Sequence, residues 1–298
     1  MNVSTSINVM FGQGPVASQM KRIYDAGFRH MDINFNDWVD QKTGNGYFPC
    51  SEEQWQDWVQ SIRKFSKQYG VVLNQAHGPL FNIFAEGERG DHLREMCGPT
   101  LKAAAELGIP WVVYHAGTAE GDFSSPEHVR NLKAENHRFF DPLVNLAEKL
   151  GAGIAIENMS DKFSRNHRGV YCAHTGDLVD LVDSFGSKQV GICWDTGHAN
   201  LQGVNQRKEL NRLGSRLKVL HVQDSDGKTD QHTAPFYGNI DWDQLLAGLR
   251  DIGYAGELTF EAHMLIRKVP ISCQNVALQL LYQLGCELKR RFDALPVA

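Results

Sequence analysis

The feature that most constrains this chain is an eightfold alternation of short apolar segments with longer segments of helical periodicity. Short runs rich in β-branched residues are typical of buried strands, and segments with a 3.6-residue apolar period are typical of helices. The predicted strands are 6–10, 28–33, 71–76, 111–115, 153–157, 189–195, 217–222 and 257–261. The predicted helices are 15–26, 51–69, 91–107, 126–150, 174–186, 205–214, 241–252 and 274–293.

Eight strand–helix units without a change in composition predict an α/β fold, a closed parallel (β/α)8 barrel that forms a single domain over residues 1–298. The alternative is a doubly wound open sheet, which usually has a turn with three glycines after an early strand. Gly12 and Gly14 come close to that pattern, but no third glycine follows at the required spacing. The barrel is therefore the preferred prediction.

Composition restricts the partners and the location of the protein. The net charge of −5 leaves no broad basic surface for a nucleic acid, and no apolar stretch approaches the ~20 residues of a membrane helix. Six scattered cysteines without a C-x-x-C pair indicate reduced thiols and a cytoplasmic location. The helical exterior of a barrel could also support a homo-oligomer.

Side chains of the kind that bind metals stand where most of the predicted strands end, although a buried strand should be apolar until it leaves the core. A single histidine or carboxylate there is explained as a hydrogen-bonded structural residue or a helix cap. Several carboxylates at one barrel mouth would repel each other unless a cation compensates their charge. The residues are His77, His115, Glu157, Asp195, His198, His221 and Glu261. We therefore predict a divalent metal at the mouth.

The types of ligand limit the identity of the metal. Carboxylate oxygens favour Mn²⁺, Mg²⁺ or Co²⁺, and Mn²⁺ is our preferred prediction. The additional histidines favour Zn²⁺ or a multinuclear zinc centre. Asp230 and His232, which follow the seventh predicted strand, add a further pair of ligands of this kind.

Seven segments resemble the xylose-isomerase-like barrel superfamily, which contains sugar and sugar-phosphate isomerases and epimerases and also apurinic-site endonucleases. The segments are HGPLFN (77–82), VVYHAG (112–117), IAIEN (154–158), GICWDTGHAN (191–200), LHVQDSDGKTDQH (220–232), GNIDW (238–242) and LTFEAH (258–263). The resemblance implies one divalent metal held by Glu157, Asp195, His221 and Glu261. It also implies that the two glutamates form an acid–base pair and that His198 contacts a substrate oxygen.

The same residues also resemble the fuller ligand set of the endonucleases, in which His77, His115, Asp230 and His232 would bind additional metal or substrate. The alternative function is therefore a zinc-dependent phosphodiesterase that acts at abasic sites. Two observations argue against it. The segment GNIDW looks more like the sugar-isomerase branch, and few basic residues follow the strands for contact with a duplex. Those present include Lys162, Arg165, Arg168 and Lys228.

We predict an isomerase or epimerase that abstracts a proton next to the carbonyl of a sugar, a sugar phosphate or a related polyol ketone. A metal-stabilised enediolate would form, and a carboxylate base would contribute about 10²–10⁴-fold. The same groups could expel water or a β-substituent, so a lyase or dehydratase stays open. A barrel that binds without turnover is disfavoured because Glu157 and Glu261 are both present. Aromatic residues near strand ends are candidate walls for the sugar: Phe35, Trp38, Phe81, Trp194 and Phe236.

Overall fold

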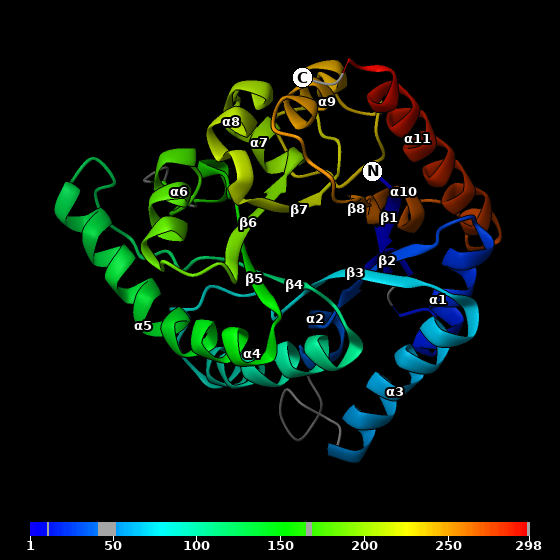
Figure 1. Cartoon of the computed structure of the whole chain (residues 1–298), viewed down its shortest axis with the longest axis horizontal. Helices are drawn as coiled ribbons and strands as arrows, with labels where there is room; N and C mark the ends of the chain where they lie inside the picture. Colours follow the sequence, from blue (N-terminus) through cyan, green and yellow to red (C-terminus); the bar gives the residue numbers. More distant parts are fainter. Residues whose placement is uncertain (11, 41–51, 165–168, 297–298) are drawn as a thin grey trace.

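The computed structural model describes residues 1–10, 12–40, 52–164 and 169–296. A ring of parallel strands surrounds the centre of the molecule, and the helices lie outside it (Figure 1). The strands are β1 (Val3–Ser6), β2 (His30–Asn34), β3 (Val72–His77), β4 (Trp111–Tyr114), β5 (Gly153–Glu157), β6 (Val190–Asp195), β7 (Leu217–His221) and β8 (Leu258–Phe260).

The strands follow one another around the ring in the order β7-β6-β5-β4-β3-β2-β1-β8, and all the paired strands are parallel. Two backbone hydrogen bonds bridge the remaining gap between β7 and β8. Val222 N donates to Thr259 O at 2.7 Å, and Glu261 N donates to Val222 O at 3.0 Å. These contacts nearly close the sheet, and the predicted (β/α)8 barrel is confirmed.

The outer helices match the eight that the periodicity predicts. They are α1 (Val16–Asp25), α3 (Glu52–Tyr69), α4 (Glu88–Leu107), α5 (Pro126–Leu150), α6 (Thr175–Ser184), α8 (Gln206–Leu213), α9 (Trp242–Asp251) and α11 (Gln274–Ala294). Three shorter helices directly follow barrel strands or lie within a few residues of them. They are α2 (Asn36–Val39), α7 (Thr196–Gln202) and α10 (His263–Arg267). The loops after the strands therefore carry structure of their own at the barrel mouth.

The predicted limits of the first strand, 6–10, are wrong. The strand β1 ends at Ser6, and Ile7–Met10 forms a 3-10 helix. The prediction missed the strand because its residues are polar, whereas buried parallel strands are usually apolar. Here the hydroxyls are paired inside the barrel: Ser4 Oγ donates to Asn74 Oδ1 at 2.6 Å. A partner 70 residues away makes a polar strand compatible with burial.

The described residues also bear on the expectations about membranes and cysteines. None of the helices in the described part of the chain is long and apolar enough to cross a bilayer. The cysteines that the structure describes are free thiols: Cys97, Cys172, Cys193, Cys273 and Cys286. Cys50 lies outside the described residues, and a reducing location stays a prediction.

Close packing of α11 against the barrel gives a stability prediction. A Cβ added at Gly285 would lie 2.5 Å from Val3 Cγ1 and 2.6 Å from Phe260 Cε2. We expect Gly285→Ala to lower the free energy of unfolding by about 1–3 kcal/mol because the extra methyl overpacks this contact. The matched control is Gly98→Ala in α4, where the nearest atom, on Leu146, is 3.9 Å away. Urea unfolding would measure both, and equal midpoints for the two variants would contradict this packing.

Candidate active site

The parallel strands deliver the predicted ligands to one edge of the barrel. Glu157, Asp195 and His221 are the last residues of β5, β6 and β7, and His77 is the last residue of β3. Glu261 directly follows β8. All five side chains are buried. The carboxyl ends of parallel barrel strands meet at one face, which explains why residues so distant in sequence lie together.

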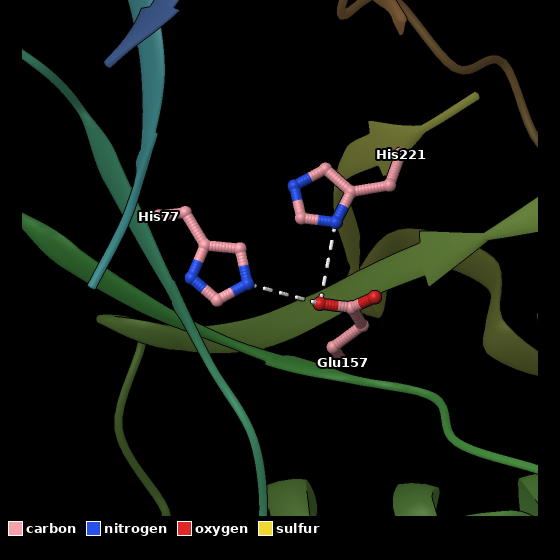
Figure 2. A group of neighbouring side chains, drawn as sticks. All are labelled: His77, Glu157 and His221. Carbon is pink, nitrogen blue, oxygen red and sulfur yellow. Dashed lines mark ion pairs between the residues drawn. The ribbon is translucent and has the colours of Figure 1, made fainter. Parts of the chain in front are cut away.

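The carboxylate of Glu157 lies between the rings of His77 and His221 (Figure 2). Its Oε2 atom lies 3.2 Å from His221 Nδ1, 3.6 Å from His77 Nε2 and 3.0 Å from His115 Nε2. Its other oxygen, Oε1, lies 3.3 Å from His198 Nδ1. One buried carboxylate therefore faces four imidazoles, and these groups can hold either protons or a cation between them.

Overlapping groups of three residues each offer ligand atoms within 4.8 Å of one another. Their members are Asp195–His221–Glu261, His77–Glu157–His221, Glu157–Asp195–His198 and His198–Asp230–His232. His221 belongs to two of these groups. Its ring is completely buried, yet neither ring nitrogen has a partner that meets hydrogen-bond geometry. Buried polar atoms are normally satisfied, so a buried imidazole that meets carboxylates at ion-pair distance but outside hydrogen-bond geometry fits a divalent cation.

The surroundings of the carboxylates determine their charge. Burial alone would raise the pKa of Glu157, but the imidazoles of His221 and His115 outweigh burial and hold that pKa well below its usual value. Burial also opposes the ionisation of Glu261, and again the histidines, His221 first, lower the pKa overall. Burial raises the pKa of Asp195 to about 6. Both glutamates are therefore carboxylates near neutral pH, able to accept a proton or bind a cation.

The loop that follows β7 adds a second half to the site. His232 Nε2 lies 3.1 Å from Asp230 Oδ2, and His198 Nε2 lies 4.0 Å from the same oxygen. Gln223 links this loop to the strand ends, because its Nε2 donates to Asp230 Oδ1 at 2.9 Å and to Asp195 Oδ1 at 3.3 Å. The amide thus holds the two carboxylates at fixed positions.

Three polar residues that support the site from beneath the strand ends were not predicted. Gln223 is one, and Asn158 is another: its Oδ1 accepts from Asp195 N at 2.6 Å, and its Nδ2 donates to Asp195 O at 3.0 Å. Asp32 on β2 is the third, with both carboxylate oxygens buried and without hydrogen-bond partners. Burial raises the pKa of Asp32 to about 6. The position of Asp32 between two apolar residues, Met31 and Ile33, within a predicted strand was the available signal for it.

A cavity of about 710 Å³ lies at the barrel mouth. This volume is in the range of small-molecule sites. The lining includes predicted residues from the strand ends and the following loops: His77, His115, Glu157, His198, Asp230, His232 and Glu261. Asn8, Asn34 and His263 add further polar groups. The site can therefore surround a small polar molecule with carboxylates, imidazoles and amides.

The prediction of aromatic walls is wrong for Phe35 and Trp194. Phe35 has no exposed surface and packs on Trp55, with ring centroids 6.0 Å apart. Trp194 is 2% exposed, and its Nε1 donates to Gln206 Oε1 at 3.1 Å. Both belong to the packing between the barrel and its helices, because neighbouring strand residues alternate between the two faces.

The other three predicted aromatic residues lie around the mouth rather than in the site cavity. Trp38 stacks on Trp58 and lines a separate cavity of about 400 Å³. Phe236 is 39% exposed and lies against Trp242. Phe81 lines a cavity beside the site. The sequence analysis missed Phe163, which lines the site cavity and stands edge-on to His198, with ring centroids 4.9 Å apart.

The fold and the site together define a class of protein, a (β/α)8 barrel with a cluster of histidines and carboxylates at the carboxyl ends of its strands. Within that class, the chain belongs to the xylose isomerase-like TIM barrel family, whose family model matches residues 20–269. The predicted resemblance to this superfamily is confirmed.

Curated relatives include enzymes of both branches. The chain is 30% identical to a D-psicose 3-epimerase of Enterocloster bolteae over 204 residues. The aligned region covers 67% of this chain and 64% of that enzyme. It is 27% identical to a probable endonuclease 4 of Methanoculleus marisnigri, over 59% of this chain and 60% of that protein. It is 26% identical to the uncharacterized protein y4fM of Sinorhizobium fredii, over 81% of this chain and 79% of that one.

Solved structures share the fold. A D-tagatose 3-epimerase-like protein superposes with a TM-score of 0.72 at 22% identity, covering 98% of this chain and 99% of that one. The IOLI protein, crystallised with a zinc atom, superposes with a TM-score of 0.75 at 16% identity, covering 99% and 100%. At these identities the likeness establishes the barrel and not the reaction.

Proposed function

We propose that this protein is a divalent-metal-dependent isomerase or epimerase that moves a proton next to the carbonyl of a sugar or related polyol ketone. The observation that carries the proposal is the pair of buried carboxylates, Glu157 and Glu261, which both face His221. Glu157 Oε2 lies 3.2 Å and Glu261 Oε2 lies 3.6 Å from its Nδ1. The sugar epimerases among the relatives support the same class of reaction.

Glu157, Asp195, His221 and Glu261 would hold the metal, and their oxygen-rich donor set fits Mn²⁺ best, with Mg²⁺, Co²⁺ or Zn²⁺ as alternatives. When bound, a divalent cation supplies positive charge that stabilises the negative charge developing on the substrate oxygens. The groups that contain His77, His115, Asp230 and His232 would hold further metal ions or contact the substrate.

The chain's own residues would carry the proton. One of the two glutamates takes a proton from the carbon next to the carbonyl, and the other returns a proton to the opposite face of the same carbon. The result is epimerisation, whereas return to the neighbouring carbon gives isomerisation. His198 would contact a substrate oxygen, and its ring is oriented for this by a 2.9 Å hydrogen bond between Nδ1 and Asn158 O.

A second candidate is a zinc-dependent phosphodiesterase related to the endonucleases. The His198–Asp230–His232 group favours it, because those three residues would hold an additional zinc ion. The charge of the cavity argues against it, since Lys268 is the only lysine or arginine among the described residues that line the cavity. Lys162, from the predicted basic set, donates to Gly227 O at 2.5 Å. Arg165 and Arg168 lie outside the described residues.

The test is the incorporation of deuterium from D2O into ketoses by the metal-loaded protein, followed by NMR. We expect exchange of a carbon-bound proton in at least one member of a panel that includes D-fructose, D-psicose, D-tagatose and an inosose. A duplex with an abasic site, incubated in parallel, should stay intact. Cleavage of the duplex without exchange in any ketone would establish the phosphodiesterase instead. Loss of a β-substituent would identify a lyase or dehydratase.

Two further predictions concern the protein as a whole. We propose a cytoplasmic location and a homo-oligomeric assembly. We also propose that the protein acts on a small sugar or sugar-derived molecule and binds neither nucleic acid nor a membrane. Cell fractionation tests the location, and light scattering of the purified protein tests the assembly. Recovery in the periplasmic or secreted fraction, or a mass of one chain in solution, would contradict the respective proposal.

A further inference from the structure

A second cavity opens directly beside the candidate active site. It has a volume of about 420 Å³ and shares four lining residues with the larger site cavity. The shared residues are Leu80, His115, Met159 and Phe163. Because the same side chains form walls of both, the two cavities are adjacent.

The walls of this neighbouring cavity are largely apolar, in contrast to those of the site. In addition to the shared Leu80, Met159 and Phe163, the lining contains five apolar side chains: Phe81, Ala116, Ala119, Phe123 and Val170. The wall at Phe123 is tightly packed, because a Cβ at Gly169 would lie 2.8 Å from its ring. A packed apolar wall favours an apolar occupant, since binding would remove both surfaces from water.

The polar side chains around the neighbouring cavity mostly serve to hold its loops. Asn82 Nδ2 donates to Thr118 O at 2.7 Å, and its Oδ1 accepts from Thr118 N at 3.1 Å. Thr118 Oγ1 accepts from Tyr171 N at 3.1 Å. The acidic residue of the lining, Glu120, is exposed to solvent. Apolar contact is therefore the main interaction that this cavity offers to a ligand.

The junction of the two cavities lies beside the proposed catalytic groups. His115 lines both cavities, and its Nε2 atom is 3.0 Å from Glu157 Oε2. Phe163 also lines both, and its ring stands edge-on to that of His198 at 4.9 Å. A group attached to a sugar bound at Glu157 can therefore reach the apolar cavity without a long linker.

We propose that the substrate is a sugar or polyol ketone that carries an apolar substituent, such as an aryl or branched alkyl group. The sugar would occupy the site cavity and the substituent would occupy the neighbouring cavity. The inference rests on the proposed function, because it assumes that the sugar binds among the carboxylates. The size is adequate, since a cavity of about 150 Å³ accommodates benzene.

The test uses ethers of D-fructose as probes for the metal-loaded protein. Affinities of the benzyl and methyl ethers at O1 and at O6 would be measured by isothermal titration calorimetry. At one of the two positions we expect the benzyl ether to bind about tenfold or more tightly than the methyl ether, because the ring leaves water. Equal affinities of benzyl and methyl ethers at both positions would overturn the proposal.

Two variants test whether the tighter binding of the benzyl ether comes from this cavity. Ala119→Phe should fill the cavity and Phe123→Ala should remove a wall, and each should reduce the advantage of the benzyl ether at least severalfold. The matched control is Ala119→Ser, which keeps the cavity open at the same exposed position. A benzyl advantage that persists in both Ala119→Phe and Phe123→Ala would place the ring elsewhere and contradict the inference. Circular dichroism of each variant checks that it is folded.

The outcome is separable from that of the proposed function. If D-fructose or another free ketose exchanges deuterium but no benzyl ether binds more tightly, the inference about the substituent fails alone. If the benzyl advantage is present and sensitive to Ala119→Phe, but no ketose or ether exchanges a proton, the apolar subsite stands and the proposed reaction fails.

Discussion

Glu261→Gln is expected to lower the rate of deuterium exchange by about 10²–10⁴-fold, the usual contribution of a positioned base. The amide has nearly the same shape as the carboxylate but cannot accept a proton at neutral pH. The structure holds Glu261 ionised, because the nearby imidazoles, that of His221 first, offset the effect of burial on its pKa. The measurement is the exchange rate by NMR at saturating metal, with the metal content determined in the same sample.

The matched control is Glu257→Gln, which makes the same substitution at the opposite end of the same strand. Glu257 directly precedes β8, whereas Glu261 directly follows it, so Glu257 lies at the end of the strand away from the barrel mouth. Its Oε1 lies 3.2 Å from His30 Nδ1. We expect this variant to exchange at the rate of the unmodified protein. Exchange by Glu261→Gln at that same rate would show that the base has been assigned wrongly, whereas loss of metal from Glu261→Gln alone would assign the residue to binding.

The strands and helices could be predicted because local sequence carries their signals. Helices α4 and α5 each end at a glycine in the left-handed conformation, Gly108 at φ 74° and Gly151 at φ 71°. Such positions favour glycine, so the sequence marks them. The first strand could not be delimited in this way, because the partner that makes the buried hydroxyl of Ser4 tolerable is Asn74 on another strand. Long-range pairing leaves no local pattern.

The residues of the candidate site also fall into those with a local sequence signal and those that depend on long-range contacts. Residues such as Glu157 and Asp195 were predictable because a charged side chain at the end of an apolar strand stands out. The role of Asn158 depends on its hydrogen bonds to Asp195, which is 37 residues away, and no spacing rule predicts them. The aromatic walls failed for a geometric reason. Closeness to a strand end fixes the height of Phe35 in the barrel, but not whether its ring faces the mouth or the helices.

His221→Asn is expected to lower the affinity for a divalent metal by about 100-fold or more, because even second-layer residues typically contribute 10–100-fold. His221 is completely buried, belongs to two of the candidate metal groups and faces Glu157 and Glu261 at ion-pair distance, with neither ring nitrogen in hydrogen-bond geometry. Competition with a fluorescent chelator measures the affinity. The melting temperature of the unmodified protein should rise with added Mn²⁺, and that of His221→Asn should not, because binding to the folded state stabilises it.

Two further variants decide which group containing His221 holds the ion. His77→Asn disrupts the His77–Glu157–His221 group, and Asp195→Asn disrupts the Asp195–His221–Glu261 group. The proposed set of ligands requires Asp195→Asn to reproduce the loss of affinity in His221→Asn, with a smaller loss in His77→Asn. The control is His30→Asn. His30 is the first residue of β2, at the end of the strand away from the barrel mouth, so this variant should bind metal as the unmodified protein does. Unchanged metal affinity in His221→Asn would show that the cation does not bind at the strand ends. The negative charge of the buried carboxylates of Glu157 and Asp195 would then lack the positive charge that we propose balances it.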